Sequence, residues 1–376
     1  MTANHHTISG TEASRPGTRG TGSAGPLGSP PARGLAETRS VEPGGEHLLP
    51  IGINIDGVLQ HDGLPTPDAA TRFAWIRDSG AFDYIEKNHN PAEDFAPYPD
   101  LVAEYGVPIG VFGGIFCAGR DEERMRWCLA TGGKLGAKLC NMQLFARHAN
   151  GSALSDQQVA DFFLDAMEHG APTHCLPSLE VHIDMWNEQF HRVERVAELL
   201  ARRHVPLRIT LDHSHQIFKI HNPQELALSG LANTPDGGYA EVLALYKLWL
   251  ESGWVVHAHT RSVATSVPHN KAMERAPGLP GRAVQYPFIQ PPPGSFHSDW
   301  RAEELEPWKQ AVRGLLAWMH AHPDRAPQRI SCEFIPFPDY GGGGRYSIWD
   351  NNIACAHWLR EEWSQLQSHT PAAAIG

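Results

Sequence analysis

Eight short apolar segments alternate with eight helical patterns along most of the chain, and this alternation constrains the fold more than any other feature. The expected strands cover residues 51–57, 82–87, 107–112, 138–144, 177–182, 207–212, 254–259 and 329–333. The expected helices cover residues 66–79, 99–105, 121–135, 155–169, 188–203, 239–252, 306–321 and 348–366. Strict alternation of strand and helix implies parallel strands joined by right-handed crossovers. Eight such units predict a closed (β/α)8 TIM barrel. An open Rossmann-like sheet is disfavoured because no GxGxxG joins the first strand to the first helix.

The first 46 residues differ in composition from the rest. They are rich in Gly, Ser, Thr, Ala and Pro, and their charges balance. Such a segment cannot bury enough apolar surface to offset its chain entropy, so we expect a disordered tail over 1–46 and a catalytic barrel over 47–370. The tail lacks the apolar centre of a secretory signal, and no apolar run is long enough to span a membrane.

Charge and cysteine usage narrow the class of protein further. The formal net charge is -11 and no Lys/Arg run is present, which argues against nucleic acid as a partner. The cysteines form no CxxC pair, a pattern that favours reduced thiols in a cytoplasmic enzyme. They are Cys117, Cys128, Cys140, Cys175, Cys332 and Cys355.

Two βα loops are much longer than usual, at residues 213–238 and 260–305. Loops that follow barrel strands lie on the catalytic face, and loops of this length are usually functional. We expect lids over the barrel mouth. The alternative is a pair of tolerated surface insertions.

The later strands share one property at their C-terminal ends, where an apolar run stops on a carboxylate or a histidine. The residues are Glu180, Asp212, His259 and Glu333. Buried groups of this kind cost several kcal/mol unless they are paired or bind a metal. Because all strand ends of a barrel meet at one mouth, we expect the four side chains to converge there.

Three carboxylates and one imidazole form a mixed N/O ligand set that suits Mn²⁺, Mg²⁺ or Co²⁺, with Fe²⁺ and Zn²⁺ also acceptable. His257 and His259 share one face of their strand, so parity cannot choose between them. His259 is favoured because it lies nearer the strand end. The competing interpretations are an ion pair with a core arginine for Glu180 and Glu333, and a helix cap for Asp212.

With these residues in place, the chain resembles the xylose isomerase-like superfamily of barrels, which includes sugar isomerases, ketose 3-epimerases, inosose dehydratases and endonuclease IV. The resemblance covers roughly residues 50–366 and rests on Glu, Asp-x-x-His, His-x-His and Glu at successive strand ends. It implies that Glu180, Asp212, His259 and Glu333 bind the metal. It also implies that Glu180 and Glu333 transfer protons and that His215 contacts substrate oxygens.

The sequence departs from the epimerase pattern at two places. Trp186 stands where the family has a second glutamate, and Glu188 lies two residues further on. Arg261 follows His259 almost directly, whereas the family's arginine lies elsewhere. These departures indicate an altered substrate rather than a lost metal site.

Further polar and aromatic residues at the strand ends are candidates for substrate contact. Earlier strand ends carry Asn54, Glu86, Lys87, Asn88, Asn141, Gln143, Arg147 and His148. The residues that we expect to contact the substrate are His182, His257, Glu86, His148, Trp186 and Arg261. Each has a structural alternative, since strand exits are commonly polar and aromatic residues are commonly core. The glycine-rich segment 337–345 would either cradle a phosphate or form a rim loop.

The favoured function is a divalent-metal-dependent sugar isomerase or epimerase that removes a proton beside a carbonyl and passes through an enediolate. It would need no organic cofactor. The alternative is a lyase on an oxo-sugar or C-glycoside at the same site. A metal phosphodiesterase and a non-catalytic sugar-binding barrel are weaker alternatives. We expect a sugar or sugar derivative as substrate and a homo-oligomer, and a small partner subunit fits the lyase alternative.

Overall fold

The computed structural model describes residues 49–60, 64–265, 270–276, 279–282, 284–325, 327, 329–336 and 345–369. Eight strands form a closed barrel in the order β1-β10-β7-β6-β5-β4-β3-β2. Every neighbouring pair is parallel, which confirms the predicted fold. The strands are β1 Ile51–Asn54, β2 Tyr84–Asn88, β3 Ile109–Phe116, β4 Leu139–Leu144, β5 Leu176–Val181, β6 Ile209–Asp212, β7 Val255–Thr260 and β10 Ile330–Cys332.

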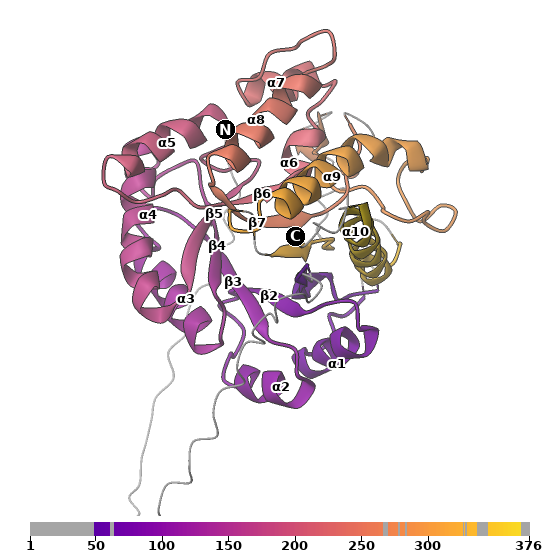
Figure 1. The fold of residues 1–376 in the computed structure, drawn as a ribbon, viewed down its shortest axis with the longest axis horizontal. Coiled ribbons are helices and arrows are strands. Elements are labelled where there is room, and N and C mark those ends of the chain that lie inside the picture. Colours follow the sequence, from indigo (N-terminus) through magenta and orange to yellow (C-terminus); the bar gives the residue numbers. More distant parts are fainter. Residues whose placement is uncertain are drawn as a thin grey trace, which may run out of the picture. The chain divides into compact units, whose positions relative to one another are not determined.

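Helices follow the barrel strands and surround them (Figure 1). They are α1 Ala69–Ser79, α2 Tyr98–Tyr105, α3 Glu122–Lys134, α4 Asp156–Gly170, α5 His191–Ala201, α8 Tyr239–Glu251, α9 Glu306–Ala321 and α10 Ile348–His369. N-cap residues in the sequence mark where two of these helices begin. Ser155 and Gln158 form a reciprocal capping box at α4, and Asp68 accepts a hydrogen bond from the backbone of Thr71 at α1. Each expected helix is therefore present.

Strand β3 extends four residues beyond its predicted end at residue 112. Glycine makes the extension possible, because a Cβ atom at Gly113 would lie only 2.7 Å from the backbone oxygen of Asn141 on the neighbouring strand. The longer strand carries Cys117 and the loop after it toward the C-terminal face of the barrel. The sequence pattern stops short here because consecutive glycines weaken a strand signal.

Both long loops contain secondary structure. Residues 213–238 include α6 Ser214–Ile217 and α7 Pro223–Leu228. Residues 260–305 include the antiparallel strands β8 Asn270–Ala276 and β9 Leu279–Gly281 and the 3-10 helix Ala302–Leu305. The predicted tail at 1–46 and residues 337–344 of the glycine-rich segment lie outside the described residues.

An ionic network, centred on the buried side chains of Arg282 and Lys219, joins the loops that follow β5, β6 and β7. Arg282 forms ion pairs with Asp184, Glu188 and Glu225. The Nζ atom of Lys219 lies 3.0 Å from Glu188 and 3.1 Å from Glu225, and the Lys219 side chain is fully buried. Glu188, which follows Trp186 by two residues, is therefore engaged in holding loops together. We call these five residues the loop clamp.

The barrel interior is polar toward its C-terminal end. Tyr84, Val111 and Leu139 pack as a small apolar cluster, while Glu86, Glu180 and His257 are buried further along their strands. The main hydrophobic core lies between the strands and the surrounding helices. Among the described residues, no helix is both long and apolar enough to cross a membrane.

Candidate metal centre

The four residues singled out at the strand ends come together. Glu180 lies near the end of β5, Asp212 ends β6, His259 is near the end of β7, and Glu333 follows β10. One ligand atom from each lies within 4.8 Å of the others, and all four residues are buried. Asp212 and His259 are paired in register on adjacent strands, which fixes their mutual position.

Three atoms of this cluster point at one another without hydrogen-bond partners. The Nδ1 atom of His259 lies 3.0 Å from Glu333 Oε2 and 3.4 Å from Glu180 Oε1. None of the three atoms makes a hydrogen bond to a residue that the structure describes. Unsatisfied buried polar atoms are costly, so their convergence on one point fits a bound cation.

The other oxygen of each glutamate is held by side-chain amides. Glu180 Oε2 accepts hydrogen bonds from Asn141 at 2.8 Å and Gln143 at 2.9 Å. Glu333 Oε1 accepts one from Asn54 at 3.1 Å. These contacts orient the remaining oxygens toward the cluster. We call these three residues the amide clamps; the sequence places them at strand ends but gives no sign of their partners.

Arg261 is fully buried beside the same cluster. Its Nη2 atom contacts Asp212, and its Nη1 atom lies 3.6 Å from Glu333. The competing interpretation is therefore realised in part for Glu333, because a core arginine lies beside it. One guanidinium against three carboxylates still leaves two negative charges, which one divalent cation would balance.

His215 lies against Arg261 as well as the acids. Its Nε2 atom is 2.9 Å from Arg261 Nη2 and 3.3 Å from Asp212 Oδ2. Burial holds the pKa of His215 well below the usual value, so the ring is neutral. The ring of His182 lies 3.8 Å away, centroid to centroid. Glu180, His182 and His215 also have metal-binding geometry, but the adjacent guanidinium disfavours a second cation there.

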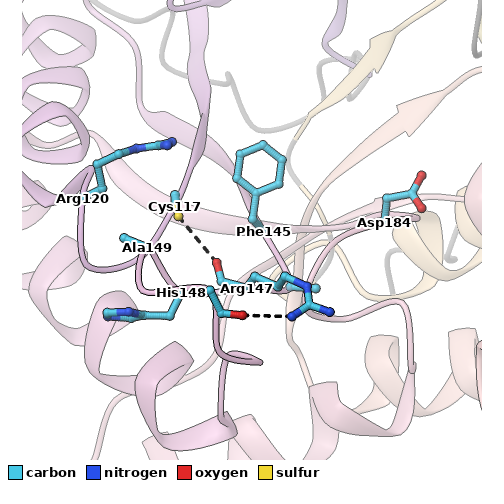
Figure 2. Close-up of a pocket in the computed structure, with 9 residues that line it drawn as sticks. Cys117, Arg120, Phe145, Arg147, His148, Ala149 and Asp184 are labelled. Carbon is cyan, nitrogen blue, oxygen red and sulfur yellow. Dashed lines mark hydrogen bonds between the residues drawn. The ribbon is translucent and has the colours of Figure 1, made fainter. Parts of the chain in front are cut away.

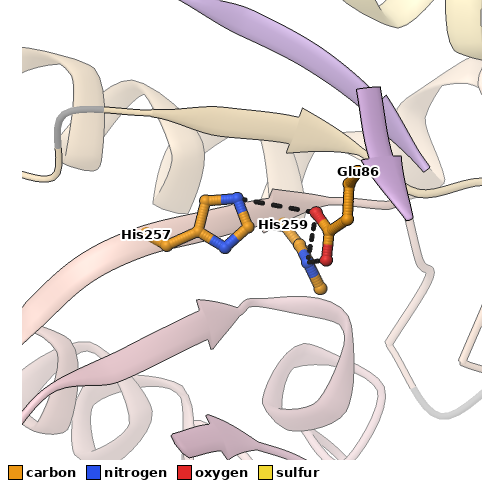
Figure 3. A group of neighbouring side chains, drawn as sticks. All are labelled: Glu86, His257 and His259. Carbon is orange, nitrogen blue, oxygen red and sulfur yellow. Dashed lines mark hydrogen bonds and ion pairs between the residues drawn. The ribbon is translucent and has the colours of Figure 1, made fainter. Parts of the chain in front are cut away.

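Three of the residues expected to contact the substrate are buried. Glu86 and His257 are fully buried and lie against His259 (Figure 3). Trp186 is 1% exposed and belongs to the hydrophobic core, where Arg192 packs on its ring. Contact of these three residues with a substrate stays a prediction, since Arg261 and His215 beside the cluster are buried to the same degree. A strand-end position alone does not indicate whether a side chain faces the open mouth.

His148 lies in a separate hollow above the ends of β3, β4 and β5 (Figure 2). This pocket has a volume of about 410 Å³, and it is lined by Cys117, Arg120, Phe145, Ala146, Arg147, His148, Ala149, Gly151 and Asp184. Phe145 is 39% exposed and lies two residues after Gln143, just beyond the end of β4. The pocket therefore borders the chain segment that carries an amide clamp. The sequence did not single out Phe145, because no sequence pattern indicates that this side chain is exposed.

Metal affinity at the centre is expected to rise with pH. Burial opposes protonation of His259, but the surrounding carboxylates, Glu333 first among them, hold its pKa well above the usual value. A cation must displace that proton, so the Mn²⁺ association constant should increase by up to about tenfold per pH unit. Calorimetric titration between about pH 5.5 and 8 in buffers of different ionisation enthalpy measures both the slope and the proton released. A flat profile would contradict this assignment.

No protein-family model and no curated protein matches the chain. A xylose isomerase-like TIM barrel protein from Mycobacterium smegmatis, solved in complex with magnesium, is similar in structure: identity is 14%, coverage is 85% of this chain and 98% of that chain, and the TM-score is 0.50. D-allulose 3-epimerase from Methylomonas sp. is 13% identical, with coverage of 84% of this chain and 96% of that chain and a TM-score of 0.49. L-ribulose 3-epimerase is 12% identical, with coverage of 88% of this chain and 100% of that chain and a TM-score of 0.49. The similarity to the Mycobacterium smegmatis protein, at 14% identity, shows the fold alone. The chain thus has the fold of the xylose isomerase-like TIM barrels.

Proposed function

We propose that this chain is a divalent-metal-dependent sugar isomerase or epimerase that works by proton transfer beside a carbonyl. The observation that carries the proposal is the convergence of Glu180 Oε1, His259 Nδ1 and Glu333 Oε2, all buried and without hydrogen bonds to described residues. A divalent ion held there with Asp212 would polarise the substrate carbonyl and stabilise the enediolate.

The two glutamates would divide the proton transfer unequally. Glu180 Oε2 accepts two amide hydrogen bonds, whereas Glu333 Oε1 accepts one. Hydrogen bonds to a carboxylate oxygen favour its ionised form and reduce its capacity to take a proton. We therefore assign removal of the α-proton to Glu333 and return of the proton to Glu180. His215, neutral through burial, would hold a substrate hydroxyl with Arg261 beside it.

The pocket beside Gln143 would receive the part of the substrate that extends from the metal centre. It offers an exposed aromatic face at Phe145 and polar groups at Arg147 and His148. Sugar rings pack on aromatic faces and need convergent polar groups for orientation. The pocket would accommodate a sugar derivative larger than a simple ketose.

Replacing Phe145 with Ala is expected to raise KM about three- to tenfold and to leave kcat within about twofold. The variant loses a stacking energy of about 0.5–1.5 kcal/mol. This contact stabilises the bound substrate and the transition state equally, so its loss raises KM and leaves kcat nearly unchanged. Steady-state kinetics on the substrate found by the exchange screen below provide the measurement. Leu248→Ala, at an exposed position on α8, is the control. An unchanged KM for the Phe145 variant would remove this pocket from the substrate path.

Deuterium exchange tests the function even while the product is unidentified. The protein is loaded with Mn²⁺ and incubated in D₂O with a panel of ketoses, aldoses and oxo-sugars, and NMR reports loss of the α-proton signal. We expect exchange with at least one sugar and its disappearance after metal removal. Full exchange by metal-free protein would overturn the proposal. Elimination of water or an aglycone would reassign the enzyme as a lyase.

A further inference from the structure

Glu86 makes its closest contact with the ring nitrogen of His259 that faces away from the metal centre. Its Oε1 and Oε2 atoms lie 3.0 and 3.1 Å from His259 Nε2, and both residues are fully buried (Figure 3). Glu86 comes from β2 and His259 from β7, which are not neighbours in the barrel. The contact therefore spans the barrel interior.

An imidazole that donates its Nε2 proton to a carboxylate leaves the lone pair on Nδ1. The Nδ1 atom of His259 is the one directed at Glu180 and Glu333. We infer that Glu86 is a positioning residue that holds His259 in the orientation and tautomer required to bind the metal through Nδ1. The inference rests on the metal centre of the proposed function and adds a residue that the cluster itself does not contain.

The surroundings of Glu86 hold it in this role. His257 Nε2 lies 3.6 Å from Glu86 Oε2 and 3.0 Å from Ser331 Oγ. Asn141 reaches Glu86 Oε1 only at 3.4 Å and prefers Glu180 at 2.8 Å. Among the described contacts of the Glu86 carboxylate, those with His259 are the shortest.

A separate cation between Glu86, His257 and His259 is the competing interpretation, since these three also have metal-binding geometry. It would require His259 to lose both ring protons and bridge two ions. The Ser331 hydroxyl at 3.0 Å already accounts for His257 Nε2. One hydrogen bond from His259 Nε2 satisfies Glu86 without such a bridge, and carboxylates that orient ligand histidines in this way change metal affinity by about 10–100-fold.

A double-mutant cycle on Mn²⁺ binding tests the inference. Dissociation constants are measured by EPR for the unmodified protein, Glu86→Gln, His259→Gln and the double variant. We expect Glu86→Gln to weaken binding about 10–100-fold when His259 is present and by less than about threefold when it is absent. Tyr84→Phe, which removes only the hydroxyl at 3.0 Å from Ser331, should bind Mn²⁺ normally.

The cycle separates positioning from simple charge attraction. If Glu86 acted only through its negative charge, Glu86→Gln would weaken Mn²⁺ binding equally with and without His259. That result would overturn the inference. Equal affinity of Glu86→Gln and the unmodified protein would overturn it as well. In both cases the unmodified protein still binds Mn²⁺, so the proposed function stands. An unmodified protein that binds no Mn²⁺ would overturn the proposed function and the inference together.

Discussion

Replacing Glu333 with Gln is expected to reduce α-proton exchange by roughly 10³-fold, within the range of 10²–10⁴ that general bases contribute. Glutamine keeps the shape of the side chain and its contact with Asn54 at 3.1 Å, but it cannot accept the proton. The measurement is the initial rate of deuterium incorporation by Mn²⁺-saturated protein, with metal content verified for each sample. Because every sample is saturated with Mn²⁺, a lower rate reports the loss of the base and not the loss of a metal ligand.

The assignment of the base also predicts an asymmetry between the glutamates. With a substrate epimer that enters from the product side, Glu180→Gln should impair proton removal, whereas Glu333→Gln should impair proton return. Comparing exchange from both epimers with both variants measures this difference. If Glu180→Gln alone abolished exchange from the forward substrate, the two roles would have to be reversed.

Removing Arg282 is expected to have the largest effect on stability. Arg282 forms ion pairs with Asp184, Glu188 and Glu225, and its own side chain is 5% exposed. Arg282→Met leaves the largely buried carboxylates of Glu188 and Glu225 with Lys219 as the remaining cation of the loop clamp. Breaking a buried ion pair in this way costs about 3–5 kcal/mol. Urea unfolding monitored by fluorescence measures the change.

Lys247→Met is the matched control. Lys247 is 73% exposed and lies 3.7 Å from Glu251, an exposed pair for which a loss of less than about 1 kcal/mol is expected. Hydrogen exchange by mass spectrometry then locates the effect of Arg282→Met. Faster exchange confined to the loops after β5, β6 and β7 would indicate local opening. Equal stability of the two variants would contradict the loop clamp.

The loop clamp also predicts how stability depends on pH. Burial opposes ionisation of Glu188, but its hydrogen bond with Arg282 and the charge of Lys219 lower its pKa to about 2. A carboxylate with a lowered pKa stabilises the folded state above its unfolded pKa, about 4.3, and loses that contribution as the pH falls toward 2. Arg282→Met should flatten this part of the stability profile. Parallel profiles for the two proteins would contradict the assignment.

The sequence predicted the barrel and the four converging residues because both depend on local information. Strand and helix periods differ, and a TIM barrel brings all strand ends to one mouth. The contact between Glu86 and His259 depends instead on which strands face each other across the interior and on their stagger. The pairing of Arg282 with Glu188, 94 residues apart, likewise has no local signal. The core position of Trp186 also had no clear local signal, because an aromatic residue after a strand fits core and rim equally well.

The amide clamps have a consequence for the choice of metal. Asn54, Asn141 and Gln143 engage one oxygen of Glu333 or Glu180 through neutral side chains of the barrel itself. With one oxygen engaged in this way, each glutamate would offer a single oxygen to an ion at the proposed centre. Such a centre would suit Mg²⁺ or Mn²⁺ better than Ca²⁺, which often takes both oxygens of a carboxylate.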